Sequence, residues 1–134
     1  MKLLVDIGNS RLKWAWLDGS ELRDPGSVVH RGRAPGAALD ELQALHRRSG
    51  QNLGQILVAS VAAPALTAAI AEGLAQKLGA PVRIAETEAA AAGVRNGYIE
   101  PRQLGVDRWL AMLAAFARCR TAVCVVDAGT ALTV

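Results

Sequence analysis

The sequence predicts an α/β domain built on a mixed β-sheet with helices packed against it. Three observations support this prediction. Before residue 34, three short apolar segments are separated by turn residues, which is the pattern of consecutive antiparallel strands. After residue 36, amphipathic segments of helical period alternate with short apolar segments, as in crossover connections. Of the 134 residues, 51% are hydrophobic and 20% are charged, which is typical of a globular domain.

Apolar alternation and turn residues define the expected elements. The second strand carries Leu12, Trp14 and Trp16 on one face, and Asp18-Gly19 predicts a hairpin turn after it. Pro64 stands where the first turn of a helix tolerates proline. Residues 88–100, with glycine breakers, are expected to be mostly loop. Strands are expected at residues 2–7, 11–17, 27–33 (ended by Pro35-Gly36), 55–61, 82–85 and 121–126, and helices at residues 37–48, 64–77 and 104–118.

The order of these elements resembles the ribonuclease-H-like core, in which three antiparallel strands are followed by crossover helices. This core is the building unit of the superfamily of actin, sugar kinases and chaperone ATPases. The resemblance implies a mixed sheet flanked by helices and, in this superfamily, a duplicated domain.

The composition argues against several functional classes. The formal net charge is +3, and the arginines are scattered without interleaved aromatic residues, so no nucleic-acid partner is expected. A small anionic substrate fits this mild basicity. Cys119 and Cys124 have apolar neighbours and are expected to be buried, reduced thiols. His30 and His46 are isolated and are expected to be surface or structural residues.

No targeting or membrane segment is expected. No apolar run approaches the roughly 20 residues of a membrane helix. The apolar run at residues 1–7 is too short for a signal peptide. The sequence therefore predicts a cytoplasmic protein without a membrane partner.

Two segments near the ends of the chain share one pattern. Residues 4–10 (LVDIGNS) and 125–131 (VVDAGTA) each carry an apolar strand that ends in Asp-x-Gly and a small polar residue. The aspartate can face a cation, the glycine admits a phosphate, and the following N–H groups can hold its oxygens. One Asp-x-Gly alone is ordinary turn chemistry. Two copies behind apolar strands favour a pair of hairpins that hold a triphosphate from both sides.

A third motif leads from a loop into a helix over residues 96–109. Asp107 falls in the first helical turn, where the helix dipole favours a carboxylate. Gly105 permits close approach by a ligand, and Arg108 offers a planar fork suited to a carboxylate. From spacing alone, the favoured interpretation is a helix-start aspartate, a solvated Arg108 and a packing role for Tyr98.

Together, these three places resemble the motifs of type III pantothenate kinases. Ser10 stands where threonine is common and keeps the hydroxyl group. A P-loop of the G-x-x-x-x-G-K type does not occur in the sequence, which argues against a P-loop kinase. The matching segments are Asp6-Ile7-Gly8-Asn9-Ser10-Arg11-Leu12-Lys13 for the first phosphate motif, Tyr98, Pro101 and Leu104-Gly105-Val106-Asp107-Arg108-Trp109 for the pantothenate motif, and Asp127-Ala128-Gly129-Thr130-Ala131 for the second phosphate motif.

This resemblance implies ATP-dependent phosphorylation of pantothenate to 4'-phosphopantothenate, the first step of coenzyme A synthesis. It implies ATP as co-substrate, with Mg²⁺ and a monovalent cation, K⁺ or NH₄⁺. Asp107 would be the general base, Asp127 would bind the monovalent cation, and Asp6 would lie near Mg²⁺. The implied ATP-binding residues are Asp6, Ile7, Gly8, Asn9, Ser10, Arg11, Leu12, Lys13 and Thr130. The implied pantothenate-binding residues are Tyr98, Gly105, Val106, Asp107 and Arg108.

Members of this family are considerably longer and form homodimers. Together with the repeated Asp-x-Gly segment, the resemblance predicts that residues 1–120 are an N-terminal ATPase-like domain and that residues 121–134 are the first strands of a truncated second one. The 134-residue chain alone is then expected to be inactive, and the apolar helix after Asp107 is a candidate dimer contact. Two alternatives are a non-catalytic regulatory factor on the same fold and an exopolyphosphatase. The latter family carries an extra serine in its first phosphate loop, which is missing between Gly8 and Asn9.

Overall fold

The computed structural model describes residues 1–31, 36–50, 52–128 and 132–133. The chain divides into two compact units, Met1–Ala85 and Glu86–Val134, and each is described by itself. The expected domains, residues 1–120 and 121–134, divide the chain at a different place because they rest on the internal repeat. That division stays a prediction.

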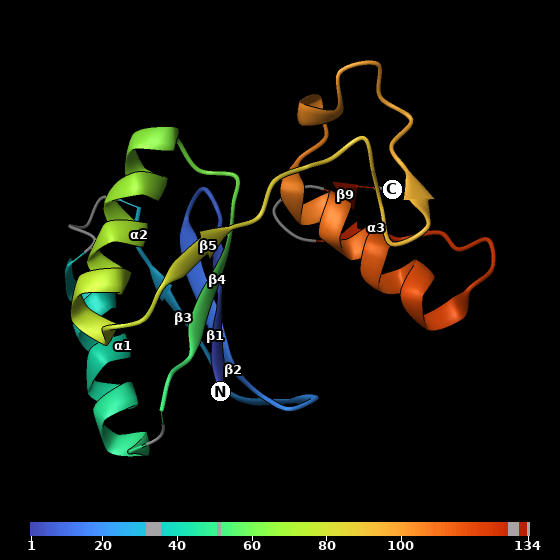
Figure 1. Ribbon diagram of the computed structural model, residues 1–134. Helices are drawn as coiled ribbons and strands as arrows, with labels where there is room; N and C mark the ends of the chain where they lie inside the picture. The colour runs from blue at the N-terminus through green and yellow to red at the C-terminus, as the bar shows by residue number, and fades with distance from the viewer. Residues whose placement is uncertain (32–35, 51, 129–131, 134) are drawn as a thin grey trace. The chain divides into compact units, whose positions relative to one another are not determined.

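The first unit is a mixed sheet with helices on one face (Figure 1). The sheet order is β3-β2-β1-β4-β5; β1, β2 and β3 pair antiparallel, whereas β4 is parallel to β1 and β5 is parallel to β4. This topology confirms the expected ribonuclease-H-like arrangement. Its elements are β1 (Lys2–Ile7), β2 (Arg11–Asp18), β3 (Glu21–Val29), α1 (Gly36–Ser49), β4 (Gln55–Ser60), α2 (Pro64–Leu78) and β5 (Val82–Ile84).

The core of this unit lies between the sheet and the two helices. In β1 the alternate residues Leu3, Val5 and Ile7 are buried in this core. Because successive side chains of a strand point to opposite faces, Asp6 belongs to the other face of the sheet. There, 43% of its side chain is exposed. The strand thus contributes to the core and presents a carboxylate at its end.

The third strand begins earlier than predicted. β3 starts at Glu21 rather than Ser27, because the Gly19-Ser20 turn leads directly into strand pairing with β2. Gly19 has a φ of 59°, which glycine adopts without strain. Pro25 is tolerated because β3 is an edge strand. The end of the predicted strand, residues 32–33, and Pro35 lie outside the described residues.

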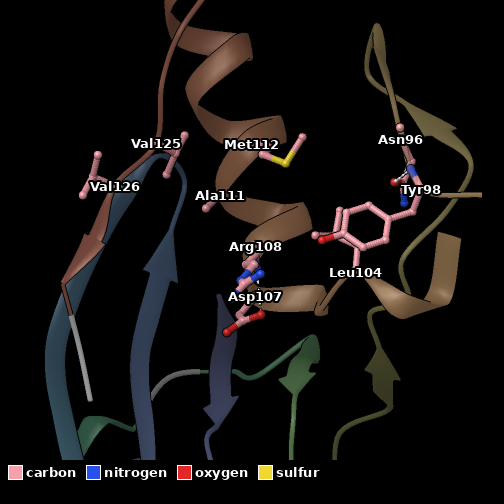
Figure 2. Close-up of a pocket in the computed structure, with 10 residues that line it drawn as sticks. Asn96, Tyr98, Leu104, Asp107, Arg108, Ala111, Met112, Val125 and Val126 are labelled. Atoms are coloured by element: carbon pink, nitrogen blue, oxygen red, sulfur yellow. Dashed lines mark hydrogen bonds between the residues drawn. The ribbon is translucent and has the colours of Figure 1, made fainter. Parts of the chain in front are cut away.

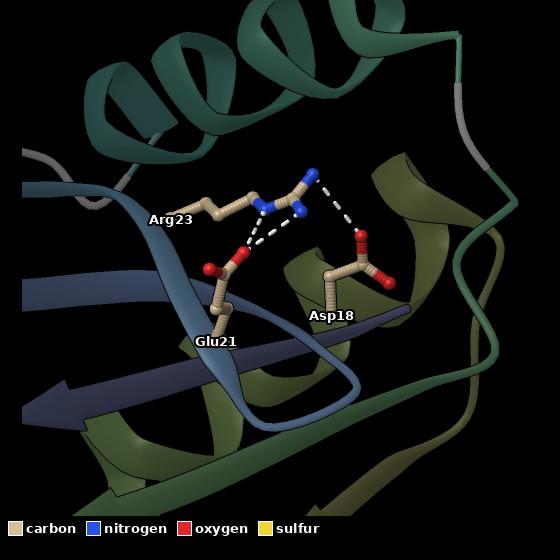
Figure 3. Close-up of polar contacts among 3 residues, drawn as sticks. All are labelled: Asp18, Glu21 and Arg23. Atoms are coloured by element: carbon tan, nitrogen blue, oxygen red, sulfur yellow. Dashed lines mark hydrogen bonds and ion pairs between the residues drawn. The ribbon is translucent and has the colours of Figure 1, made fainter.

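An ion-pair cluster flanks the turn between β2 and β3 (Figure 3). Arg23 donates through Nε and Nη2 to Glu21 Oε2, at 3.2 and 2.9 Å, and its Nη1 lies 3.1 Å from Asp18 Oδ2. The hydrogen bond to Glu21, and after it the attraction of Asp18, raises the pKa of Arg23 above its ordinary value. These side chains are largely solvent-exposed, so the cluster is expected to contribute little to stability.

The second unit is organised around one long helix. The predicted helix at residues 104–118 is confirmed, with its start at Val106 and a 3₁₀ turn before it. The loop prediction for residues 88–100 holds except for a short hairpin. The elements are β6 (Ala90–Ala91), β7 (Val94–Arg95), η1 (Pro101–Gln103), α3 (Val106–Cys119), β8 (Asp127–Ala128) and β9 (Leu132–Thr133).

Two expectations for the end of the chain were wrong. Residues 121–126 form no strand, because an apolar run becomes a strand only where a neighbouring strand pairs with it, and pairing begins at Asp127. Val123 is accordingly 44% exposed and Val126 58% exposed. Cys119 and Cys124 are also exposed rather than buried. They belong to the last residues of α3 and the segment after it, where every described side chain from Ala117 to Cys124 is exposed.

None of the described helices combines the length with the apolar character needed to cross a bilayer.

Candidate functional site

The first candidate region is the loop between β1 and β2. Gly8 N donates to Arg11 O at 2.9 Å, which closes the predicted turn. Asp6 and Lys13 are directly opposite each other in the β1–β2 ladder, and Lys13 Nζ lies 3.8 Å from Asp6 Oδ2. The turn therefore places a carboxylate and an ammonium group side by side at the same end of the sheet.

The β1–β2 loop makes a tight turn at Gly8, and the residues after it are at least partly exposed. A Cβ atom at Gly8 would lie 3.3 Å from Arg11 O, so the glycine permits the tight turn. Asn9 is exposed and Ser10 half-buried. Arg11 is held to the neighbouring strand, since its Nη1 donates to Ser27 Oγ at 3.1 Å.

Two of the expected ATP-binding residues have their side chains in the core. Ile7 is 0% exposed and Leu12 is 1% exposed, and both belong to the cluster beneath the helices. Neither side chain is available to a ligand, and Ile7 O already accepts a hydrogen bond from Val61 N at 3.0 Å. Their side chains instead stabilise the two strands that carry the loop.

The second candidate region is a cavity of about 610 Å³ in the second unit (Figure 2). It brings together Tyr98, Asp107 and Arg108, which the sequence singled out. Tyr98 is 46% exposed, and Figure 2 shows its ring beside Leu104, while Ala111 and Met112 continue the wall along α3. The residues that line the cavity are Asn96, Gly97, Tyr98, Leu104, Asp107, Arg108, Ala111, Met112, Val125 and Val126.

Asp107 lies in the first turn of α3, as predicted. Its Oδ1 accepts a hydrogen bond from Arg108 N at 2.8 Å, and the side chain is exposed. Gly105, the residue before the helix, offers no side-chain cap. The N-terminal end of the helix dipole favours negative charge at this position. The arrangement presents an exposed carboxylate among the residues that line the cavity.

Two further predicted contacts do not line the cavity. Val106 is 8% exposed and its side chain is buried, so only its main chain could reach a ligand. Gly105 accepts the first helical hydrogen bond, from Trp109 N at 3.0 Å. Both residues position the start of α3.

Sequence reasoning missed the apolar wall and Asn96. Asp107 and Ala111, like Arg108 and Met112, are four residues apart in α3, so the helical period could have placed each pair on one face. Val125 and Val126 carried no such signal, because the apolar run at residues 121–126 predicts a strand. Asn96 falls in the predicted loop at residues 88–100, and no pattern in the sequence indicates that its side chain is buried, with 8% exposed.

The Asn96 carboxamide connects three parts of the loop around the cavity. Its Nδ2 donates to Glu88 O at 3.3 Å and to Pro101 O at 3.2 Å, and its Oδ1 accepts from Tyr98 N at 3.0 Å. We therefore expect Asn96→Ala to lower the free energy of unfolding by about 2 kcal/mol, since buried groups lose their partners. Urea unfolding measures this change in the free energy of unfolding.

The exposed Asn52 provides a matched control. Asn52→Ala is expected to change the free energy of unfolding by less than about 0.5 kcal/mol. Equal stability of the two variants would contradict the structural importance of the Asn96 carboxamide.

The third candidate region is the second Asp-x-Gly segment. β8 and β9 pair antiparallel, with Asp127 opposite Thr133 and Ala128 opposite Leu132, so strands flank this segment as they flank the first one. Thr130 and the turn around it lie outside the described residues. The convergence of the two segments on one triphosphate stays a prediction.

The described residues contain no group of three or more His, Cys, Asp or Glu side chains placed to hold a metal ion. A single accessible carboxylate such as Asp6 still fits Mg²⁺, which is commonly bound through one or two carboxylates together with substrate phosphates and water.

Comparisons with known proteins point to one family. The family model for type III pantothenate kinases matches residues 2–134. A type III pantothenate kinase of Halorhodospira halophila is 43% identical over 100% of this chain and 53% of its own length. Those of Nitrosococcus oceani and Aromatoleum aromaticum are 39% and 41% identical, over 99% and 100% of this chain and 50% and 52% of their own lengths. The chain spans about half the length of the curated relatives it matches.

A solved structure of a Ppx/GppA family member from Aquifex aeolicus also shows some similarity. It is 16% identical, with a TM-score of 0.34, over 63% of this chain and 35% of that one. This similarity is too low to support an inference about function.

Proposed function

The chain belongs to the type III pantothenate kinase family, and we propose that the full-length protein phosphorylates pantothenate with ATP in the first step of coenzyme A synthesis. By full-length protein we mean a protein that contains this chain and has the length of these relatives. The observation that carries the proposal is the cavity that joins Tyr98, Asp107 and Arg108 to an apolar wall.

The chemistry of the cavity matches that of pantothenate. This substrate has a carboxylate at one end, and a hydroxyl group beside a dimethyl-substituted carbon at the other. Arg108 offers a planar fork for the carboxylate. Ala111, Met112 and Val125 offer apolar surface for the methyl groups. Asp107 is then the group that receives the hydroxyl proton.

The transfer itself needs positioning more than covalent participation by the protein. The hydroxyl oxygen of pantothenate forms a bond to the γ-phosphorus, the bond from that phosphorus to the bridging oxygen breaks, and ADP leaves. Asp107 orients the hydroxyl group and accepts its proton as the new bond forms. The hydrogen bond that Arg108 N donates to Oδ1 orients the carboxylate.

The β1–β2 loop is the proposed site of the ATP phosphates. Lys13 contributes a positive charge, and the main chain of Gly8, Asn9 and Ser10 contributes N–H donors. Asp6 would hold Mg²⁺, which when bound neutralises phosphate charge. Asp6 stands opposite Lys13 in the β1–β2 ladder, which puts both charged groups next to the loop.

We further propose that Asp127 binds the monovalent cation and that Thr130 contacts ATP. Asp127→Asn in the full-length protein is expected to raise the K⁺ concentration for half-maximal activity about tenfold, which corresponds to a loss of about 1.4 kcal/mol in binding. The neutral amide attracts a cation less strongly than the carboxylate does. Initial rates measured across a K⁺ series test this expectation.

Asp24, an exposed aspartate of β3, provides the control for this series. Asp24→Asn is expected to leave the K⁺ dependence unchanged. Identical K⁺ activation curves for Asp127→Asn and the unaltered protein would count against the cation site.

The direct test is product formation from ATP and pantothenate. The full-length protein is expected to produce ADP and 4'-phosphopantothenate, and the 134-residue chain alone is expected to have little or no activity. Binding of pantothenate without phosphorylation would instead favour the regulatory alternative. Turnover by the isolated chain would show that further residues are dispensable.

We also propose a cytoplasmic homodimer, without nucleic-acid or membrane partners. The apolar face of α3 supports a subunit contact, because Leu110 is 38% exposed, and Leu113 and Phe116 are only partly buried in the described structure.

A further inference from the structure

His30 contacts both ends of the β1–β2 loop from outside it. The residue follows β3 directly and is 7% exposed. Its Nε2 lies 2.8 Å from Gly8 O, and its main-chain N donates to Ser10 O at 3.0 Å. A residue 22 positions away in the sequence thus holds two carbonyl groups of the loop. This agrees with the expectation that His30 is structural, and it adds a specific task.

We propose that His30 is a positioning residue for the nucleotide: it fixes the peptide between Gly8 and Asn9 so that the Asn9 N–H can meet a phosphate oxygen. This inference rests on the proposed function, which assigns the loop to the ATP phosphates. It extends that assignment to a side chain outside the three motifs.

The geometry of the peptide bond supports the proposal. In a trans peptide the C=O and the N–H of one plane point in opposite directions, and no cis peptide bond occurs among the described residues. Because Gly8 O points to His30, the Asn9 N–H points away from it. The Gly8 N–H is already used within the loop, where it donates to Arg11 O. The next amide along the chain is therefore the one that His30 orients.

The hydrogen bond also defines the chemistry that position 30 requires. A carbonyl oxygen only accepts, so the imidazole must donate through a protonated Nε2. Glutamine can place an amide N–H near the position of Nε2. Leucine fills similar space without a donor, and the asparagine amide is one methylene shorter. These three residues separate a need for the donor from a need for bulk.

The experiment compares His30→Leu and His30→Gln in the full-length protein. His30→Leu is expected to raise the KM for ATP about tenfold, the effect of losing one aligned hydrogen bond worth about 1.4 kcal/mol. The KM for pantothenate is expected to stay within about twofold, because Asn9 and the loop do not line the pantothenate cavity. His30→Gln is expected to recover most of the affinity for ATP.

His46 is the matched control, because it is the second histidine of the chain and also makes a structural contact. Its ring stacks on Trp16 with the ring centroids 5.7 Å apart. His46→Gln is expected to lower thermal stability without changing either KM. If the KM for ATP rises in all of these variants in proportion to the fall in melting temperature, the proposal is overturned.

An unchanged KM for ATP in His30→Leu would also overturn the proposal. If that variant does not fold, His30→Asn replaces it, and equal KM values for ATP in His30→Asn and His30→Gln overturn the proposal. A wild-type protein that does not phosphorylate pantothenate with ATP would instead remove the proposed function, and this inference with it. The wild-type turnover and the ratio of the two KM values therefore distinguish the two failures.

Discussion

Asp107→Asn in the full-length protein is expected to reduce kcat for pantothenate phosphorylation about a thousandfold. This magnitude lies within the range for loss of a general base. The asparagine amide does not accept the hydroxyl proton at neutral pH, although its carbonyl oxygen can still orient the hydroxyl group. The KM for pantothenate is expected to change little, because Arg108 and the apolar wall remain. Release of ADP and formation of 4'-phosphopantothenate measure the loss.

The fold of this variant should be intact, which makes the result interpretable. The Asp107 side chain is exposed. Arg108 N donates a hydrogen bond to its Oδ1, and the asparagine oxygen can accept the same hydrogen bond. Glu100→Gln changes an exposed carboxylate of the same unit and is expected to keep full activity. Unchanged turnover in Asp107→Asn would remove the catalytic assignment of Asp107.

Trp109→Ala is expected to destabilise the second unit by about 3–5 kcal/mol, the usual cost of removing a buried tryptophan side chain. Trp109 is 1% exposed, and the other buried apolar residues described in this unit are Leu104 and Val106. A core this small has little to replace the lost contacts. Because Asp107 and Arg108 stand on the same helix, the pantothenate cavity is expected to be lost with it.

Hydrogen exchange of the full-length protein locates this effect. Amides of α3 are expected to lose protection, whereas amides of β1 and β4 in the first unit retain it, because proteins open in cooperative local units. Ile99→Ala, in the same unit at a residue that is 99% exposed, is expected to cost less than about 0.5 kcal/mol. Loss of protection in both units, or in neither, would contradict a separate core around Trp109.

The family and much of the local structure were predictable from the sequence. The alternation of Leu12, Trp14 and Trp16 marked the core face of β2, and the three motifs identified the type III pantothenate kinase family that the comparisons support. The place of Asp107 in the first turn of α3 was also predicted correctly. These features depend on residues close together in the chain, whose spacing records which face of a strand or helix is buried.

Only the tertiary structure decided which segments become neighbours. The apolar residues 121–126 were predicted to form a strand but pair with none of the described strands, while Pro25 stands within a strand because it lies at the sheet edge. The burial of Asn96 and the contact of His30 with Gly8 likewise join distant residues. Strand pairing and burial depend on partners elsewhere in the chain, which local periodicity does not identify. For this protein, the sequence by itself determined the strand and helix faces and the motifs, and the tertiary structure determined what surrounds them.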